Sequence, residues 1–144
     1  MSNFILVDGL WHCDCDSICA LICALGDVEV LFLKDFEATV GVAEERLSAV
    51  ADMLRSIRDE PVQPAAVPSP CSDAALVTGS HNEDDAYLLR ISPEGRRVLI
   101  CGLATALKEI AEWEFKTRVT FSRAFIESLL TALKAADGEA TNKT

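Results

Sequence analysis

Apolar side chains recur at helical intervals in two early segments, at Ile18, Leu21, Ile22 and Leu25 and again at Leu47, Val50, Leu54 and Ile57. This spacing predicts a helix over residues 16–25, ended by Gly26, and a second helix over residues 43–58. Residues 28–33 are apolar and β-branched, which favours a short strand or an extended buried link. The apolar run at residues 4–7 predicts a short strand at the start of the chain.

The sequence changes character after the second helix. Regular helix is excluded there by Pro61, Pro64, Pro68 and Pro70. Residues 79–85 are polar and acidic. We therefore expect residues 59–85 to form a linker or a long loop, followed by a short strand at residues 87–91.

The C-terminal part of the chain predicts two more helices. Ser92-Pro93-Glu94 combines a hydroxyl cap, a proline at the first helical position and an acid in the first turn, which indicates a helix start. One apolar face of that helix is marked by Leu99, Leu103, Leu107 and Ile110. A last helix is predicted from Ser122, ended by Gly138, with residues 138–144 as a disordered tail.

The two halves of the chain resemble each other at an offset of 79 residues. The matched pairs are Phe36 with Phe115, Val40 with Val119, Leu47 with Ile126, Val50 with Leu129, and Leu54 with Leu133. We therefore expect a mainly α fold, with α+β as an alternative, in which two helix–link–helix halves with short strands pack on one core. The predicted organisation is an acidic N-terminal half at 1–58, a linker at 59–85, a C-terminal half at 86–137 and a tail at 138–144.

Acidic residues are concentrated at the start of the chain, whose formal net charge is −10. Residues 1–60 hold 12 acidic and 4 basic side chains, a net charge of −8, and residues 92–144 hold 7 and 8, a net charge of +1. Phosphates need Lys and Arg, so this balance argues against a nucleic-acid or anionic-membrane partner. A basic protein would be steered toward the N-terminal half, although acids also serve simply to keep a small protein soluble.

The cysteines raise the question of a metal site. His12, Cys13, Asp14 and Cys15 precede Cys19 and Cys23, and thiolates and imidazoles bind zinc. This spacing is not that of a zinc knuckle or ribbon, and no second ligand pair follows, so we predict no metal and no cofactor. Redox sensing by Cys13 or Cys15 is an alternative, and Cys19 and Cys23 have the spacing of small core residues on a helix.

Further sequence features favour a cytoplasmic protein without catalytic activity. No run approaches the length of a membrane span, and the N-terminus lacks the basic region of a secretory signal. In the cytoplasm the six cysteines are expected to be reduced. The two histidines, His12 and His81, have no second well-placed base, and the glycines form no phosphate-binding loop, so no catalytic residue is predicted.

The C-terminal stretch carries a recognisable local pattern. It runs from Ile91-Ser92-Pro93-Glu94 through Glu112-Trp113-Glu114-Phe115-Lys116-Thr117-Arg118-Val119 to Leu129-Leu130-Thr131-Ala132-Leu133. This pattern resembles that of small uncharacterised bacterial proteins, some of them candidate immunity proteins of toxin-delivery systems. It departs from them at Thr120, where their turn has glycine, while Gly41 keeps that glycine in the first half. The resemblance implies no catalytic residue.

Together, charge and resemblance predict a protein-binding, toxin-neutralising (immunity-type) protein that acts on a basic partner. The acids expected to form its partner surface are Asp14, Asp16, Asp27, Glu29, Asp35, Glu37, Glu44 and Glu45. Acidic surfaces of this kind accelerate association with basic nucleases by electrostatic complementarity. The alternative is a regulatory or adaptor module with no inhibitory role.

Overall fold

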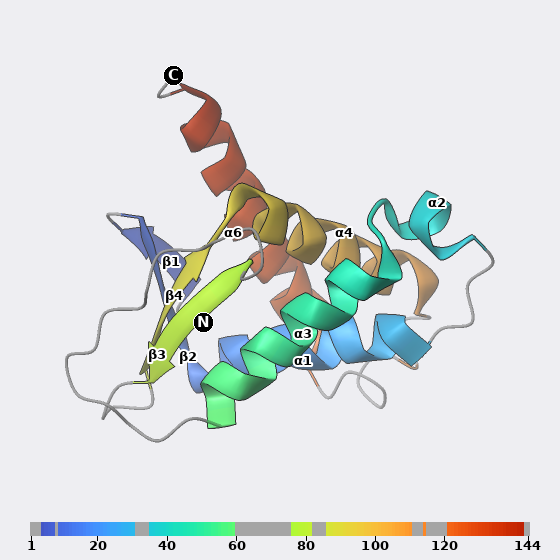
Figure 1. Ribbon diagram of the computed structural model, residues 1–144, viewed down its shortest axis with the longest axis horizontal. Coiled ribbons are helices and arrows are strands. Elements are labelled where there is room, and N and C mark those ends of the chain that lie inside the picture. Colours follow the sequence, from blue (N-terminus) through green and yellow to red (C-terminus); the bar gives the residue numbers. More distant parts are fainter. Residues whose placement is uncertain are drawn as a thin grey trace.

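The computed structural model describes residues 4–7, 9–30, 35–59, 76–81, 86–110, 114 and 121–142 (Figure 1). The elements follow the order β1 (Phe4–Val7), β2 (Leu10–Asp14), α1 (Cys15–Val30), α2 (Phe36–Val40), α3 (Glu44–Asp59), β3 (Val77–His81), β4 (Ala86–Ile91), α4 (Pro93–Glu109) and α6 (Arg123–Asn142). Helices dominate these elements and accompany one small sheet. The fold is therefore α+β, which was the alternative within the predicted class.

The four strands form an antiparallel sheet in the order β1-β2-β4-β3. Two hairpins meet at the central pair β2–β4, where Trp11 lies opposite Leu89. Side chains alternate between the two faces, so Phe4 is buried while Ile5 and Val7 are 56% and 47% exposed. The helices cover one face of this sheet (Figure 1).

The helices pack around α1, which contacts both α3 and α4, while α4 also contacts α6. Close approach of α1 and α4 depends on Gly102, because a Cβ at that position would overlap the side chain of Leu25. The packing also crosses between the hairpins, since α3 lies on β3 and α6 lies on β1. The fully buried core residues are Ile18, Leu21, Leu25, Leu47, Leu54, Leu89, Leu99, Leu103, Ile126, Leu129 and Leu133.

Local capping signals place two helix starts where the sequence predicts them. The Ser92 hydroxyl accepts a hydrogen bond from the Gly95 backbone N–H at 2.9 Å, with Pro93 at the first position of α4. The Ser122 hydroxyl accepts one from the Phe125 N–H at 3.2 Å before α6. These bonds satisfy amides that the helix itself leaves unpaired, which is why the prediction is confirmed.

Two predicted boundaries in the first half are wrong. The first helix does not stop at Gly26 but continues to Val30, so residues 28–30 form its last turn rather than a strand or link. Val28 is fully buried in that turn. Burying such a side chain contributes about 1.5–3 kcal/mol, which exceeds the roughly 1 kcal/mol cost of a helical glycine. Residues 31–33 of the predicted strand lie outside the described residues.

Two later boundaries also need correction. The predicted linker at 59–85 contains strand β3. Pairing with β4 supplies the backbone hydrogen bonds of this strand, and the polar sequence of the segment does not indicate that pairing. The prolines of that segment lie outside the described residues. α6 continues past Gly138 to Asn142, since an isolated glycine costs a helix only about 1 kcal/mol. In the part of the chain that the structure describes, every helix is too short or too polar to cross a bilayer.

Candidate functional site

The eight acids predicted to form a partner surface lie in separate places on the molecule. Asp14 and Asp16 lie where β2 leads into α1. A second group lies at the opposite end of α1, on its last turn, on α2 and on the first turn of α3: Glu29, Asp35, Glu37, Glu44 and Glu45. A helix of 16 residues spans about 24 Å, so no single interface of modest size covers both groups. We call the second group the acidic end.

Asp14 has a structural role. Its carboxylate Oδ1 accepts a hydrogen bond from the Ser17 backbone N–H at 2.8 Å, and its side chain is half-buried. This is the geometry of an N-cap, with a negative charge at the positive end of the helix dipole. Asp16, in the first turn of α1, is exposed. The two neighbouring acids therefore have different uses, although the sequence presents them as equivalent.

The acidic end lies away from the sheet, on the side of the molecule where α1 ends, α2 lies and α3 begins (Figure 1). Asp35, Glu37, Glu44 and Glu45 are all exposed. Asp35 adopts a left-handed backbone conformation (φ 53°) and its side chain makes no capping hydrogen bond to α2. A shallow hollow of about 450 Å³ opens beside Asp35 and Glu37. These carboxylates therefore face solvent.

A contact with α4 holds α2 in place. Val40 at the end of α2 is buried, and Gly41 follows with φ 101°, a conformation that glycine adopts without strain. A Cβ at position 41 would lie 3.3 Å from the Cys101 Sγ on α4. Nearby, the Arg46 guanidinium pairs with the Glu94 carboxylate at 3.2 Å and joins the first turns of α3 and α4. The acids of α2 and α3 are therefore displayed on a packed scaffold.

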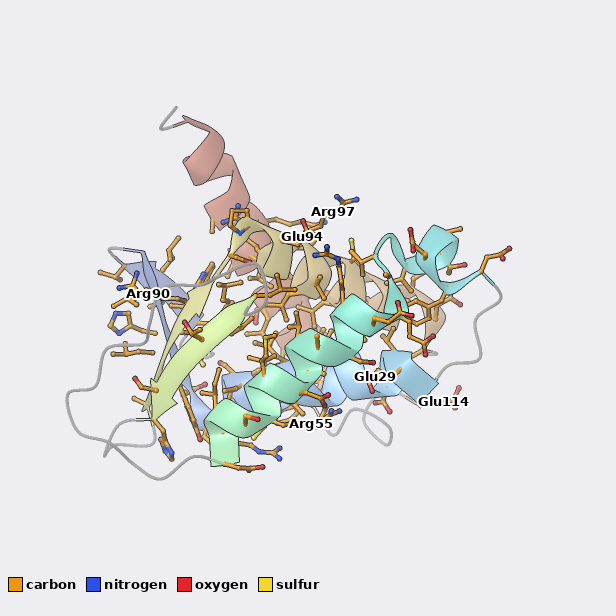
Figure 2. All side chains as sticks on the ribbon, viewed as in Figure 1. Glu29, Arg55, Arg90, Glu94, Arg97 and Glu114 are labelled. Carbon is orange, nitrogen blue, oxygen red and sulfur yellow. The ribbon has the colours of Figure 1, made fainter. Side chains whose placement is uncertain are left out.

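Glu29 is the half-buried member of the acidic end (Figure 2). Its Oε1 lies 3.8 Å from the Arg55 Nη2 of α3. Burial raises the pKa of its carboxyl, the Arg55 charge opposes that shift, and the nearby Asp52 and Glu44 carboxylates add to it. The pKa of Glu29 therefore depends on the charged side chains of α3, and its pairing with Arg55 places it at the boundary between α1 and α3.

The boundary between α1 and α3 also holds a row of thiols. Cys15, Cys19 and Cys23 follow one another at four-residue intervals on α1, and the Cys15 and Cys19 Sγ atoms lie 3.9 Å apart. Two guanidiniums of α3 face this row. The Arg58 guanidinium hydrogen bonds to the Asp59 carboxylate at 3.1 Å and interacts electrostatically with Cys19, and the Arg55 charge acts on Cys23. We call these five side chains, three thiols and two guanidiniums, the thiol seam.

The other predicted acid, Asp27, lies at the thiol seam and not at the acidic end. It continues the four-residue spacing of the thiols and is half-buried. Burial raises the pKa of the Cys23 thiol, the Asp27 charge raises it further, and the Arg58 and Arg55 charges lower it. Asp27 is therefore an electrostatic neighbour of the thiols. The spacing of Cys19 and Cys23 also matched that of small core residues on a helix. In the structure both are half-buried.

The cysteines in the described ranges form no metal centre of the usual kind. Within those ranges no three His, Cys, Asp or Glu side chains are placed to hold a metal ion. Burial raises the pKa of the Cys13 thiol far above its ordinary value, and the charges of Asp14, Cys15 and Cys19 act in the same direction. Cys13 is therefore a neutral core thiol. His12 is exposed on β2, and His81 stacks on Tyr87 with ring centroids 4.4 Å apart.

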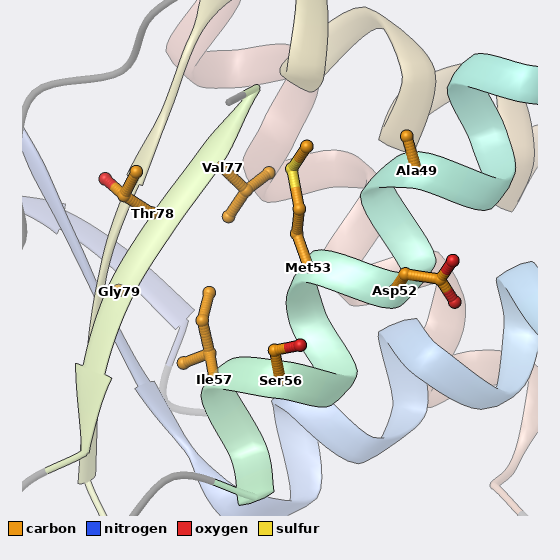
Figure 3. A pocket seen from close by; sticks show the side chains of 8 residues that line it. All are labelled: Ala49, Asp52, Met53, Ser56, Ile57, Val77, Thr78 and Gly79. Atoms are coloured by element: carbon orange, nitrogen blue, oxygen red, sulfur yellow. The ribbon is translucent and has the colours of Figure 1, made fainter. Parts of the chain in front are cut away.

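A further groove of about 480 Å³ runs between α3 and β3 (Figure 3). Met53 and Ile57 reach from α3 toward Val77, while Asp52 and Ser56 point away from the strand. Gly79 permits this approach, because a Cβ there would lie 3.0 Å from the Ile57 side chain and 2.6 Å from Leu89. The groove is open and mostly apolar, and it holds no cluster of polar groups that would orient a small ligand.

Sequence reasoning missed the thiol seam as a unit. The four-residue spacing of the thiols was visible, and so was the three-residue spacing that places Arg55 and Arg58 on one face of α3. Nothing local indicated that these two faces meet.

Comparison of the chain with protein-family models, with curated proteins and with solved structures gives no match in any of the three.

Proposed function

We propose that this protein binds a basic protein partner through the acidic end. The observation that carries the proposal is a group of four exposed carboxylates, at the N-cap of α2, on α2 and in the first turn of α3: Asp35, Glu37, Glu44 and Glu45. Among the described residues none of these four forms a salt bridge, so their charge is directed at solvent. Such a field raises the rate at which a basic surface is encountered.

Within that role we favour neutralisation of a toxin, the function of an immunity-type protein. An acidic surface resembles the phosphate backbone that a basic nuclease recognises, and occupying that site would block the enzyme. The scaffold supports this use, because the contact of Val40 with the core fixes α2 before binding and lowers the entropic cost of association. An adaptor would use the same acids without covering an active site.

The experiment begins with the partner that co-purifies with the full chain from its native host. Association is then measured at low and at high salt for the wild type and for a D35K/E37K double variant. We expect an association rate about tenfold or more slower at low salt, with the two proteins converging at high salt, because screening removes the effect of surface charge. Co-expression with the partner separates the two roles, since an immunity protein restores growth that the partner arrests.

Glu127→Lys is the matched control, because Glu127 is an exposed acid on α6, where it pairs with Arg123 at 3.3 Å. This reversal should change the rate by less than about twofold. Equal rates for wild type and D35K/E37K at low salt, or an acidic partner, would refute the electrostatic proposal. Binding without rescue of growth would favour the adaptor.

We also propose that the two halves are copies of one helix–link–helix unit. In support, the offset of 79 residues carries α1 onto residues 94–109 and α3 onto residues 123–138, which fall within α4 and α6. The inner strands β2 and β4 pair with each other, and each outer strand supports the last helix of the other half. Relatives of this chain, aligned half against half, should show the same offset.

A cytoplasmic location is proposed as well. The observation in its favour is that the cysteines within the described residues form no disulfide bond: Cys13, Cys15, Cys19, Cys23 and Cys101. Thiols remain reduced in the cytoplasm and form structural disulfides in oxidising compartments. Fractionation of the native host, followed by detection of the full chain, tests this directly. Recovery outside the cytoplasm would overturn it.

A further inference from the structure

We infer that Cys15 and Cys19 form a dithiol site for thiol–disulfide exchange with low-molecular-weight disulfides, such as oxidised glutathione. The site lies at the end of the thiol seam next to the sheet, and it is separate from the acidic end. Three independent features support the inference. These are the distance between the two thiols, their unequal exposure and the guanidinium of Arg58 beside one of them.

A bond between the two cysteines needs a local change of the backbone at the start of α1. The two Sγ atoms are 3.9 Å apart, and residues four apart in an α-helix have Cα atoms about 6.2 Å apart, within the span of about 4.4–6.8 Å that disulfides bridge. Their Cβ atoms are about 5–6 Å apart, which exceeds the roughly 3.5–4.5 Å of a disulfide. The first turn of α1 must therefore open for the bond to form. A first turn opens more readily than the helix interior, because fewer hydrogen bonds constrain it.

The surroundings assign different roles to the two thiols. Cys15 is exposed and is the first residue of α1, so an incoming disulfide reaches it first. Cys19 is half-buried and lies near the Arg58 guanidinium, which pairs with the Asp59 carboxylate. Cys15 is the attacking thiol and Cys19 the resolving thiol.

The exchange takes place in two balanced steps. The Cys15 thiolate attacks one sulfur of oxidised glutathione, the disulfide bond of glutathione breaks, and one glutathione thiolate leaves with a mixed disulfide on Cys15. The Cys19 thiolate then attacks the Cys15 sulfur, forms the Cys15–Cys19 bond and releases the second glutathione thiolate. Each thiolate is formed by loss of its proton to water. The protein loses two electrons and two protons, and oxidised glutathione becomes two molecules of the thiol.

The test treats the reduced full-length chain with oxidised glutathione and maps the product without reduction. Cleavage before aspartate separates residues 14–15 from residues 16–26, so a Cys15–Cys19 bond links these two fragments. The variant Cys23→Ser must give the same linked pair, because Cys23 lies in the second fragment. In Cys19→Ser the glutathione adduct on Cys15 should persist. An adduct that persists equally in the wild type would overturn the inference.

Two arginine variants separate chemistry from packing. Arg58→Gln should slow the release of the second glutathione by about three- to tenfold, because it removes the positive charge beside Cys19. Arg55→Gln is the matched control on the same helix, since Arg55 acts on Cys23 and Glu29. Its rate should stay within about twofold of the wild type. Equal slowing by both variants would mean that general loosening of α3 governs the rate, and it would overturn the role of Arg58.

A second measurement uses the wild type alone. Phenylarsine oxide is a trivalent arsenical that bridges two close thiols, and it should protect Cys15 and Cys19 from alkylation while leaving Cys101 reactive. Failure to protect this pair would contradict the 3.9 Å geometry. Oxidation should leave the salt-dependent association of the acidic end unchanged, so the dithiol site and the proposed function can fail independently.

Discussion

The two ends of α1 differ in what surrounds their acidic side chains. At the start of the helix, Asp14 is half-buried and accepts a backbone hydrogen bond, so its charge stabilises the helix. Beyond the other end, Asp35 and Glu37 are exposed and lie beside an open hollow. The same residue type therefore stabilises the fold at one end and faces solvent at the other. The net charge of a segment does not distinguish these uses.

The largest expected effect comes from the core that supports both ends. Leu54 is fully buried in α3, which carries the guanidiniums of the thiol seam and the first-turn acids of the acidic end. Leu54→Ala should lower the free energy of unfolding by about 2–5 kcal/mol, through lost burial and the cavity that remains. Urea denaturation measures this. A loss below about half a kcal/mol would show that Leu54 does not anchor α3 in the core. The thiol seam and the acidic end would then lack this shared support.

A smaller effect separates the two ends directly. Asp14→Ala should destabilise the protein by about 1 kcal/mol, because the first turn of α1 loses its cap. Glu37→Ala should change the free energy of unfolding by less than about half a kcal/mol, since the side chain is exposed. Thermal and urea unfolding of both variants provide the comparison. Similar costs for the two substitutions would contradict the distinction between structural and displayed acids.

The middle of α1 offers a substitution that strengthens the helix joining the ends. Gly26→Ala should raise the free energy of unfolding by about 0.5–1 kcal/mol, because alanine loses less backbone entropy than glycine in a helix. The added Cβ would meet only the Arg55 Nη2, at 3.4 Å. Urea unfolding checks the gain. Gly102→Ala is the contrasting variant and should destabilise the protein, because its Cβ would overlap the Leu25 side chain. A loss of stability in Gly26→Ala would mean that the space beside Arg55 does not accommodate a methyl group.

The smallest effect is a pH dependence at Glu29. Its folded pKa is raised above the ordinary 4.5, mainly by burial, so the folded state holds this proton more tightly than the unfolded chain. The stability that the protonated form contributes is lost as pH rises from about 4.5 through the folded pKa. Relative to the wild type, Glu29→Gln should therefore be more stable at pH 7 than near pH 4.5.

Urea midpoints of Glu29→Gln and the wild type across this pH range measure the difference, with Glu45→Gln as an exposed control. A constant difference between Glu29→Gln and the wild type would show that Glu29 titrates as it does in the unfolded chain. The size of the change is limited because the Arg55 charge already offsets part of the burial. The experiment distinguishes half-buried Glu29, which packs between α1 and α3, from the exposed acids of the acidic end.

Local chemistry explains which parts of the fold could be predicted from the sequence. The hydroxyls of Ser92 and Ser122 bond to amides three residues ahead, so the starts of α4 and α6 depend only on neighbouring residues. The apolar spacing of α3 likewise predicted Leu47, Val50, Leu54 and Ile57 as buried. The acids of the candidate partner surface were chosen from composition, which does not show whether a side chain points to solvent or toward the core. The structure alone separates Asp14 and Asp27 from Asp35 and Glu37.

By itself the sequence determined helix periodicity, the capped starts of two helices, the acidic balance and the spacing of the thiols. Tertiary structure alone decided that α1 passes through Gly26, that the polar segment Val77–His81 becomes a sheet edge, and that Arg58 meets Cys19. The physical reason is the range of the interactions involved. A cap or an apolar stripe acts within a few residues, whereas strand pairing, burial and the approach of charges join segments that are far apart in the chain and become favourable only when the core has formed.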